Sequence, residues 1–292
     1  MKIATAAYQP EWHGDWDSLT AKLDRWVSDA ARQGADLLVF PEYAGVEAGL
    51  IGAPQNRTPV GWVAHLHDRH AEWCDLHSSL ARRYDVHILS GSLPWAQDEV
   101  TTNAAALCAP SGEIGVQHKM ILTPYERNEM QLSPGRDLQL FETTLAKIAV
   151  LICYDSEFPL LARALVAAGA DVILVPSCTE APAGQTRVRQ SCRARAIEGQ
   201  CLVVQAPLVG ALPHCEIIDQ NTGRAGIFCP PDNGLPQDGI IAQGQPDTPG
   251  WTYADVDLAL IAAVRRTGQV GNFAHWPEQD ARCNTITTQR LW

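Results

Sequence analysis

The sequence lacks the features that mark membrane-spanning, secreted and nucleic-acid-binding proteins. Its 292 residues contain no apolar run near the roughly 20 residues that a membrane helix needs. The first residues, MKIATAAYQPEW, turn polar too early to form the apolar part of a signal peptide. Basic residues number 22 against 33 acidic ones, and the formal net charge of −11 argues against nucleic acid or an anionic membrane as a partner. We therefore expect a cytoplasmic protein that binds neither.

The cysteines do not form the pairs that a disulfide framework or a zinc site would need. They are odd in number and scattered, with no CxxC spacing, so free thiols in a reducing compartment are expected. Most should be buried, since a free cysteine behaves as a small hydrophobe. Hydrophobic residues make up 46% of the chain, which is ample for a large core, and the length allows one or two domains.

Short apolar runs alternate with segments of helical period, which predicts an α/β fold. Helices are expected from about 61 to 83, through 160–169 and over about 187–199, while 123–135 has the composition of a loop. The segments 104–110 and 113–119 predict a hairpin. The remaining predicted strands are 2–9, 37–40, 86–91, 138–142, 147–153, 171–175 and 201–207.

One pattern occurs twice. GADLLVFP (34–41) and GADVILVP (169–176) share Gly-Ala-Asp, four apolar residues and a proline, and each follows a predicted helix. A chance match is the alternative in a chain rich in alanine and valine. If the repeat is real, the protein has two pseudo-equivalent αβ halves, and both strand ends open onto one central site.

Three chemically useful side chains stand at predicted strand ends. Cys153 ends the apolar run in VLICYDSEFP, where a core thiol is the alternative reading. Glu42 follows a buried run in FPEY and could equally be a helix cap or a surface acid. Lys119, in VQHKMIL, could be a solvated lysine at a sheet edge.

Taken together, these residues form a coherent set for nucleophilic catalysis. A cysteine with an ordinary pKa of about 8.5 is mostly protonated at neutral pH and needs a base. A desolvated glutamate can accept that proton and later deliver it to a leaving amine. A lysine can stabilise the oxyanion, and the backbone N–H of Tyr154 is the natural second donor.

FPEY, HKM and LICYDSEFP resemble, in this order, three signature blocks of the nitrilase superfamily, the carbon–nitrogen hydrolases. The resemblance runs from residue 2 to about 275. It implies a four-layer αββα sandwich over 1–275, followed by a C-terminal tail over 276–292. It also implies a catalytic triad of Glu42, Lys119 and Cys153, no cofactor and no metal, and a homodimer or higher homo-oligomer.

The same resemblance suggests further residues. A second site glutamate is expected shortly after the lysine, with Glu126 preferred and Glu129 as the alternative. RARAIEG (193–199) is similar to a family helix that pairs Arg195 with Glu198.

Two further residues are candidates for the walls of the substrate pocket. Cys178 lies just past the second GAD strand and is a candidate for substrate binding. Glu157 stands where relatives often carry an arginine, which suggests a preference for neutral or amine-bearing amides over carboxylated ones. An acid in the first turn of a helix is the plainer explanation for Glu157.

The sequence therefore predicts a hydrolase that cleaves a non-peptide C–N bond of a small amide through a Cys153 thioester. Nitrile or N-carbamoyl hydrolysis with the same triad is the alternative within enzymes, and a non-catalytic scaffold relative is an alternative outside them. A zinc protein is a third possibility. It would use donors spaced along the segment 65–77, namely His67, His70, Cys74 and His77.

Overall fold

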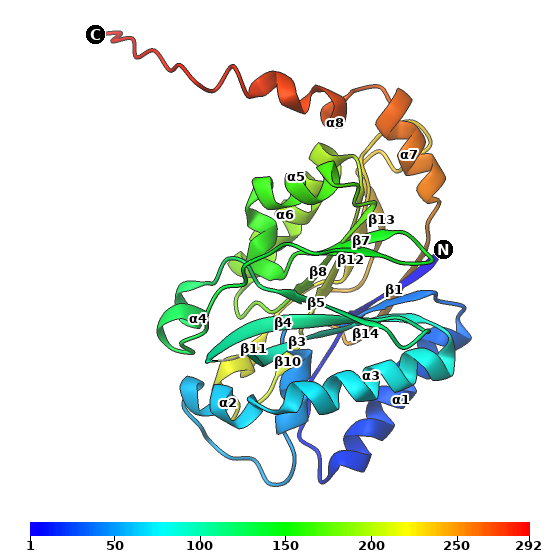
Figure 1. Cartoon of the computed structure of the whole chain (residues 1–292), viewed down its shortest axis with the longest axis vertical. Coiled ribbons are helices and arrows are strands. Elements are labelled where there is room, and N and C mark those ends of the chain that lie inside the picture. Colours follow the sequence, from blue (N-terminus) through cyan, green and yellow to red (C-terminus); the bar gives the residue numbers. More distant parts are fainter. Residues whose placement is uncertain (98) are drawn as a thin grey trace.

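The computed structural model describes residues 1–97 and 99–292, which form two six-stranded sheets packed face to face (Figure 1). The first sheet contains, in spatial order, β14 (Gly250–Asp255), β1 (Lys2–Ala7), β2 (Leu37–Val39), β3 (His87–Gln97), β4 (Val100–Cys108) and β5 (Ile114–His118). The second contains β13 (Ile240–Gln243), β12 (Gly226–Phe228), β9 (Leu202–Pro207), β8 (Val172–Ser177), β7 (Lys147–Val150) and β6 (Leu140–Glu142).

Helices cover the outer faces of both sheets, which completes the four layers. Helices α1 (Trp16–Arg32) and α3 (Arg69–Tyr84) lie on the first sheet, and α5 (Pro159–Ala167) and α6 (Pro182–Gly199) lie on the second (Figure 1). The predicted αββα sandwich is confirmed. The shorter elements are α2 (Pro59–Leu66), α4 (Pro124–Asn128), α7 (Leu258–Thr267), α8 (Asn272–His275), η1 (Ala44–Gly49), η2 (Cys153–Glu157), η3 (Glu216–Ile218), η4 (Trp276–Gln279), β10 (Gly210–Ala211) and β11 (Gln220–Asn221).

The central strands are apolar on both faces, because one face of each sheet packs against the other sheet and the opposite face packs against helices. Ile3 and Leu37 belong to the core between the two sheets. Their neighbours Ala4 and Leu38 belong to the core beneath α1 and α3. Successive side chains of a strand point to opposite faces, so one short run supplies both cores.

The repeated GAD pattern corresponds to a repeated structural unit. Strands β1, β2 and β3 pair in parallel, and so do β7, β8 and β9. At the start of β2, the backbone N–H of Asp36 donates to Lys2 O, and the Asp36 carboxylate accepts from Lys2 N. Asp171 makes the same two bonds to Lys147 at the start of β8. The two GAD segments therefore occupy equivalent positions in two strand arrangements with the same parallel pairing.

The structure corrects two local predictions. The helix expected from 61 to 83 is divided into α2 and α3, and His67 and Asp68 lie at the break. The segment expected to be a loop over 123–135 contains the short helix α4, which begins after a capping box.

Two further features concern the cysteines and the C-terminus. Each of the nine cysteines is a free thiol, and most are buried. The last residues run away from the sheets beyond α8 (Figure 1), while the domain boundary at residue 275 stays a prediction. Within 1–97 and 99–292, no helix has both the length and the apolar character needed to cross a bilayer.

Candidate active site

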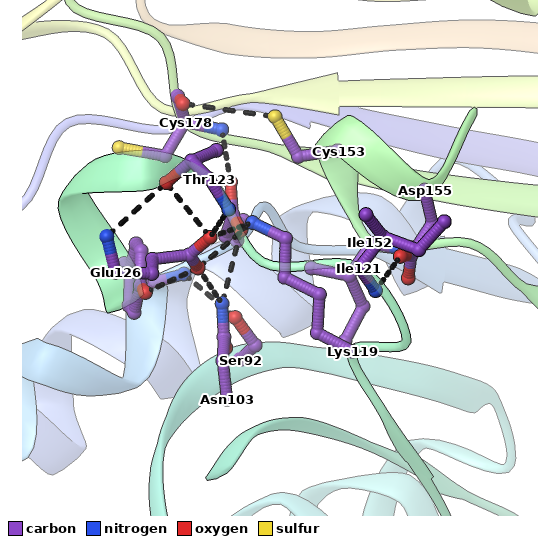
Figure 2. Close-up of polar contacts among 12 residues, drawn as sticks. Ser92, Asn103, Lys119, Ile121, Thr123, Glu126, Ile152, Cys153, Asp155 and Cys178 are labelled. Carbon is purple, nitrogen blue, oxygen red and sulfur yellow. Dashed lines mark hydrogen bonds and ion pairs between the residues drawn. The ribbon is translucent and has the colours of Figure 1, made fainter. Parts of the chain in front are cut away.

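The three residues singled out at strand ends lie together between the two sheets. Glu42 follows β2, Lys119 follows β5, and Cys153 opens η2 just after β7. All three side chains are buried and line one cavity of about 540 Å³. Figure 2 shows Lys119 reaching from the first sheet towards Glu126, with the Cys153 sulfur above them on the second.

Lys119 is the centre of a buried ionic network. Its Nζ lies 2.7 Å from Glu42 Oε1 and 2.8 and 2.7 Å from the two oxygens of Glu126. Burial acts to lower the pKa of Lys119, but the two carboxylates outweigh it and hold the pKa well above its usual value. The lysine is therefore a permanent cation in the site.

Glu126 is placed by the local structure of α4. It is the third residue after Thr123, and its carboxylate completes the capping box by accepting from the Thr123 backbone N–H at 2.8 Å. It also accepts from the hydroxyls of Tyr43 (2.7 Å) and Thr123 (3.0 Å). Burial acts to raise its pKa, but Lys119 and these donors lower it overall. Glu129, the alternative considered from sequence, is exposed at the end of the same helix.

Glu42 accepts fewer hydrogen bonds than Glu126, and its pKa shifts in the opposite direction. Its Oε1 accepts from Lys119 and from the Asn103 amide at 3.0 Å, and its Oε2 accepts from the Cys178 backbone N–H at 2.9 Å. Burial raises the pKa of Glu42, and repulsion from Glu126 adds to it, so that Lys119 does not fully compensate. When two neighbouring carboxyl groups have pKa values shifted in opposite directions, the group with the raised pKa suits a general base and the other remains an ionised carboxylate. Here Glu42 is the first and Glu126 the second.

Cys153 occupies a strained backbone position with a buried thiol. Its φ of 48° lies in the left-handed region, which is uncommon for a residue other than glycine. The thiol points towards the carbonyl oxygen of Cys178, at 3.7 Å. Burial and the nearby Glu42 carboxylate raise the pKa of Cys153 well above its usual value, against the opposing effect of Lys119. The thiol is therefore protonated at neutral pH and needs a base to become a nucleophile.

Asp155 fixes the turn that carries Cys153. Its carboxylate accepts backbone N–H bonds from Ile152 at 3.1 Å, Ile121 at 2.8 Å and Met120 at 3.1 Å. The first donor belongs to the second sheet and the other two to the loop after Lys119. This side chain therefore ties the thiol and the lysine, which come from different sheets, into one arrangement.

The other predicted pocket residues also line the cavity. Tyr154 is at its wall, and within the described part of the chain its backbone N–H has no hydrogen-bond acceptor. The Cys178 sulfur lies 3.2 Å from Asn221 Oδ1. Glu157 is paired with Arg187 at 3.4 Å, so its charge at the mouth is partly offset by a cation that sequence reasoning did not anticipate.

The expected ion pair on α6 is present outside the cavity. Arg195 Nε lies 3.1 Å from Glu198 Oε2, and Arg195 also donates to the carbonyl of Ser156 at 3.4 Å. Through the bond to Ser156, this ion pair contacts the segment that follows Cys153 from the side of α6, which is a structural role.

The histidine-rich segment does not bring its donors together. His77 is buried and bonded to the Trp73 carbonyl, while His70 stacks on Trp95. Among residues 1–97 and 99–292, the set whose ligand atoms all lie within 4.8 Å of one another is Glu11, His13 and Glu47. There the Lys22 ammonium already lies 2.6 Å from Glu47 Oε1, so a cation of the protein itself neutralises this acid.

Sequence reasoning missed three residues of the network: Asn103, Tyr43 and Asp155. Asp155 was visible beside Cys153 but had no assigned partner. Asn103 stands before three alanines in TTNAAALC, and an amide in an otherwise apolar buried strand is a usable signal. Tyr43 carries no such signal, because its role depends on a left-handed backbone at φ 58°.

Comparisons with known proteins identify the family to which the chain belongs. The family model for carbon-nitrogen hydrolase matches residues 2–266. The "Probable hydrolase YhcX" of Bacillus subtilis is 33% identical over 270 residues, which are 92% of this chain and 52% of the relative. The chain thus spans about half the length of that relative. "Omega-amidase NIT2" of Danio rerio is 26% identical over 257 residues, covering 82% of this chain and 83% of the relative.

A solved structure shares the fold. It is a variant of the amidase from Nesterenkonia sp. AN1, described as showing the Michael addition of acrylamide at the active-site cysteine. It matches with a TM-score of 0.72 at 22% identity, and the match covers 91% of this chain and 97% of that one.

Proposed function

Because the chain belongs to the carbon–nitrogen hydrolase family, we propose that it hydrolyses a small amide at a C–N bond other than a peptide bond. The observation that carries the proposal is the buried Lys119 ammonium, held 2.7 Å from Glu42 in the cavity that the Cys153 thiol also lines. Such a set supplies a nucleophile, a base and an oxyanion-stabilising charge in one place. The active-site cysteine named for the Nesterenkonia amidase is consistent with a thiol nucleophile here.

In the first half-reaction, Glu42 takes the proton from Cys153, and the thiolate attacks the amide carbon. The developing oxyanion is stabilised by Lys119 and by the backbone N–H of Tyr154. As the tetrahedral intermediate collapses, Glu42 returns the proton to the leaving amine, and a thioester remains on Cys153. Glu126 stays ionised throughout and keeps Lys119 in place, in line with the lowered pKa of Glu126.

In the second half-reaction, water replaces the amine. Glu42 accepts a proton from the water, and the resulting hydroxide attacks the thioester carbon. Collapse of this second intermediate releases the carboxylic acid, and Glu42 returns the proton taken from water to the departing Cys153 sulfur. The balance is one amide and one water consumed, with one acid and one amine formed.

The charge at the cavity mouth supports a substrate class. The lining carboxylates there are Glu157, Glu180, Glu216 and Asp219, against the single guanidinium of Arg187. Like charges at close range oppose binding in a partly desolvated site. We expect neutral or amine-bearing amides to be preferred over carboxylated ones.

The test is the release of ammonia or amine from a panel of amides, N-carbamoyl compounds and nitriles. Activity should be found among the amides and should be lost in Cys153→Ala. Cys192→Ala is the matched control, because this thiol is equally buried but lies on α6 outside the cavity lining. Turnover that survives in Cys153→Ala, or is lost equally in both variants, would contradict the proposal. The homo-oligomer stays a prediction, which light scattering can check.

A further inference from the structure

Asn103 lies beneath the ionic network and contacts both of its acids. It is on β4 with a fully buried side chain, and its Nδ2 donates to Glu42 Oε1 at 3.0 Å and to Glu126 Oε1 at 3.1 Å. Its backbone carbonyl accepts from Lys119 N at 2.8 Å. Figure 2 shows the amide pointing from the first sheet towards Glu126 and Lys119.

The other end of the same amide has no partner. Asn103 Oδ1 is buried without a hydrogen bond among the described residues. Turning the amide over would place this oxygen against two carboxylates, so the acids dictate its orientation. A buried acceptor left unpaired costs free energy, and such a group calls for an explanation beyond packing. The explanation offered by the geometry is the pair of N–H bonds on the other side.

Those N–H bonds reach the two acids of the network, whose combined negative charge exceeds the single positive charge of Lys119. The charged and titratable groups that face Glu42 are Lys119 after β5, Glu126 on α4, Cys153 on η2, Cys178 after β8 and the Tyr43 hydroxyl beside Glu126. Two buried carboxylates thus share one buried ammonium. Asn103 supplies a donor to each carboxylate without adding a charge, and hydrogen bonds to an ionised carboxylate favour the ionised form.

We propose that Asn103 is a positioning residue that keeps Glu42 ionised, and so able to act as a base, through its N–H bond to Glu42, in an orientation held by its second N–H bond to Glu126. The inference rests on the proposed roles of Glu42 and Cys153. It assigns to β4 a part in the reaction although Asn103 does not line the cavity and does not touch the substrate.

The experiment needs no identified substrate. Iodoacetamide labels thiols, and the rate of Cys153 labelling is followed by mass spectrometry across pH in wild type and in Asn103→Leu, which has similar size and no donor. The wild-type rate should fall as the pH drops through the pKa of Glu42. In Asn103→Leu this acid limb should move to a pH about one unit higher. At pH values below the wild-type limb, Cys153 of the variant should then be labelled roughly tenfold more slowly than Cys153 of the wild type.

Gln205→Leu is the matched control. Gln205 is buried on β9 and lies outside the cavity lining, and within residues 1–97 and 99–292 its amide oxygen has no hydrogen-bond partner, like that of Asn103. It should change the melting temperature and leave the acid limb unmoved. Asn103→Ser, whose shorter side chain cannot bridge both acids, should shift the limb in the same direction if the leucine variant does not fold.

The outcomes separate the two proposals. An acid limb that stays at the wild-type pH in a folded Asn103 variant would overturn the role of Asn103 alone. A wild-type protein in which Cys153 is not labelled ahead of the other buried thiols, or is labelled without an acid limb, would overturn the proposed function itself. Cys283 is exposed and is expected to label whatever the state of the site.

Discussion

Replacing Glu42 by glutamine removes the proposed base while keeping the size of a buried side chain. Burial and the Glu42 charge together raise the pKa of Cys153, and losing that charge relieves only part of the shift. Even an unperturbed thiol, with a pKa of about 8.5, would be only a few per cent ionised at neutral pH. A positioned general base contributes about 10²–10⁴-fold to rate, so turnover should fall by that factor in Glu42→Gln.

The substitution also has a structural cost that the hydrogen bonds define. The two oxygens of Glu42 accept from Lys119, Asn103 and the Cys178 N–H. A glutamine must turn its NH₂ group towards at least one of these donors, and a buried donor left unpaired costs about 1–3 kcal/mol. Urea unfolding should therefore show a modest loss of stability in a protein that still folds.

The assay compares amide turnover and unfolding of Glu42→Gln with those of Glu129→Gln. Glu129 is an exposed glutamate at the end of α4, so its variant should match wild type in both measurements. Near-normal kcat in Glu42→Gln on the best substrate found would refute the assignment of the base. Equal loss in both variants would show that the effect is not specific to the buried carboxylate.

Four further outcomes are expected. Lys119→Ala should lose about 10²–10³-fold in kcat, because an oxyanion-stabilising charge is removed, and unchanged kcat would contradict this. Loss of activity on iodoacetamide treatment should parallel modification of Cys153 in mass maps; complete inactivation with Cys153 unmodified would refute its role. Cys178 is the neighbouring cavity thiol expected to label too, whereas the exposed Cys283 should label without loss of activity. Glu157→Gln should reduce the preference for an amine-bearing amide over its carboxylated analogue, measured as a ratio of kcat/KM, and a ratio that does not move would leave Glu157 as a partner of Arg187 only. Prolonged EDTA treatment should change neither activity nor melting temperature, whereas loss of both together with a stoichiometric metal would favour the zinc alternative.

The catalytic candidates could be predicted because each is signalled locally. Glu42, Lys119 and Cys153 each end an apolar run in a short motif, and the two GAD segments indicated that strand ends would meet. Glu126 was a weaker prediction, because it depends on a capping box within a segment that has loop composition.

The supporting contacts depend on packing that no local pattern specifies. Asn103 meets Glu42 across 61 residues of sequence, and Asp155 meets Met120 across 35. The first contact requires the register of β4 within its own sheet, and the second requires the docking of the two sheets. The break between α2 and α3 was missed for a similar reason, since HLHDRH contains neither glycine nor proline to interrupt the helical period.

Because the site is divided between the two sheets, the proposed reactivity of Cys153 depends on their docking. Asn103 is in the first sheet and Glu42 and Lys119 follow strands of that sheet, whereas Cys153 follows a strand of the second sheet. Two contacts join them: the Cys178 N–H bonded to Glu42, and the Asp155 carboxylate bonded to the loop after Lys119. Under the proposed roles, a chain in which the sheets have not docked carries a thiol without its base. We therefore expect Cys153 to gain its general base only when the two sheets dock, so that this activation is a property of the completed fold.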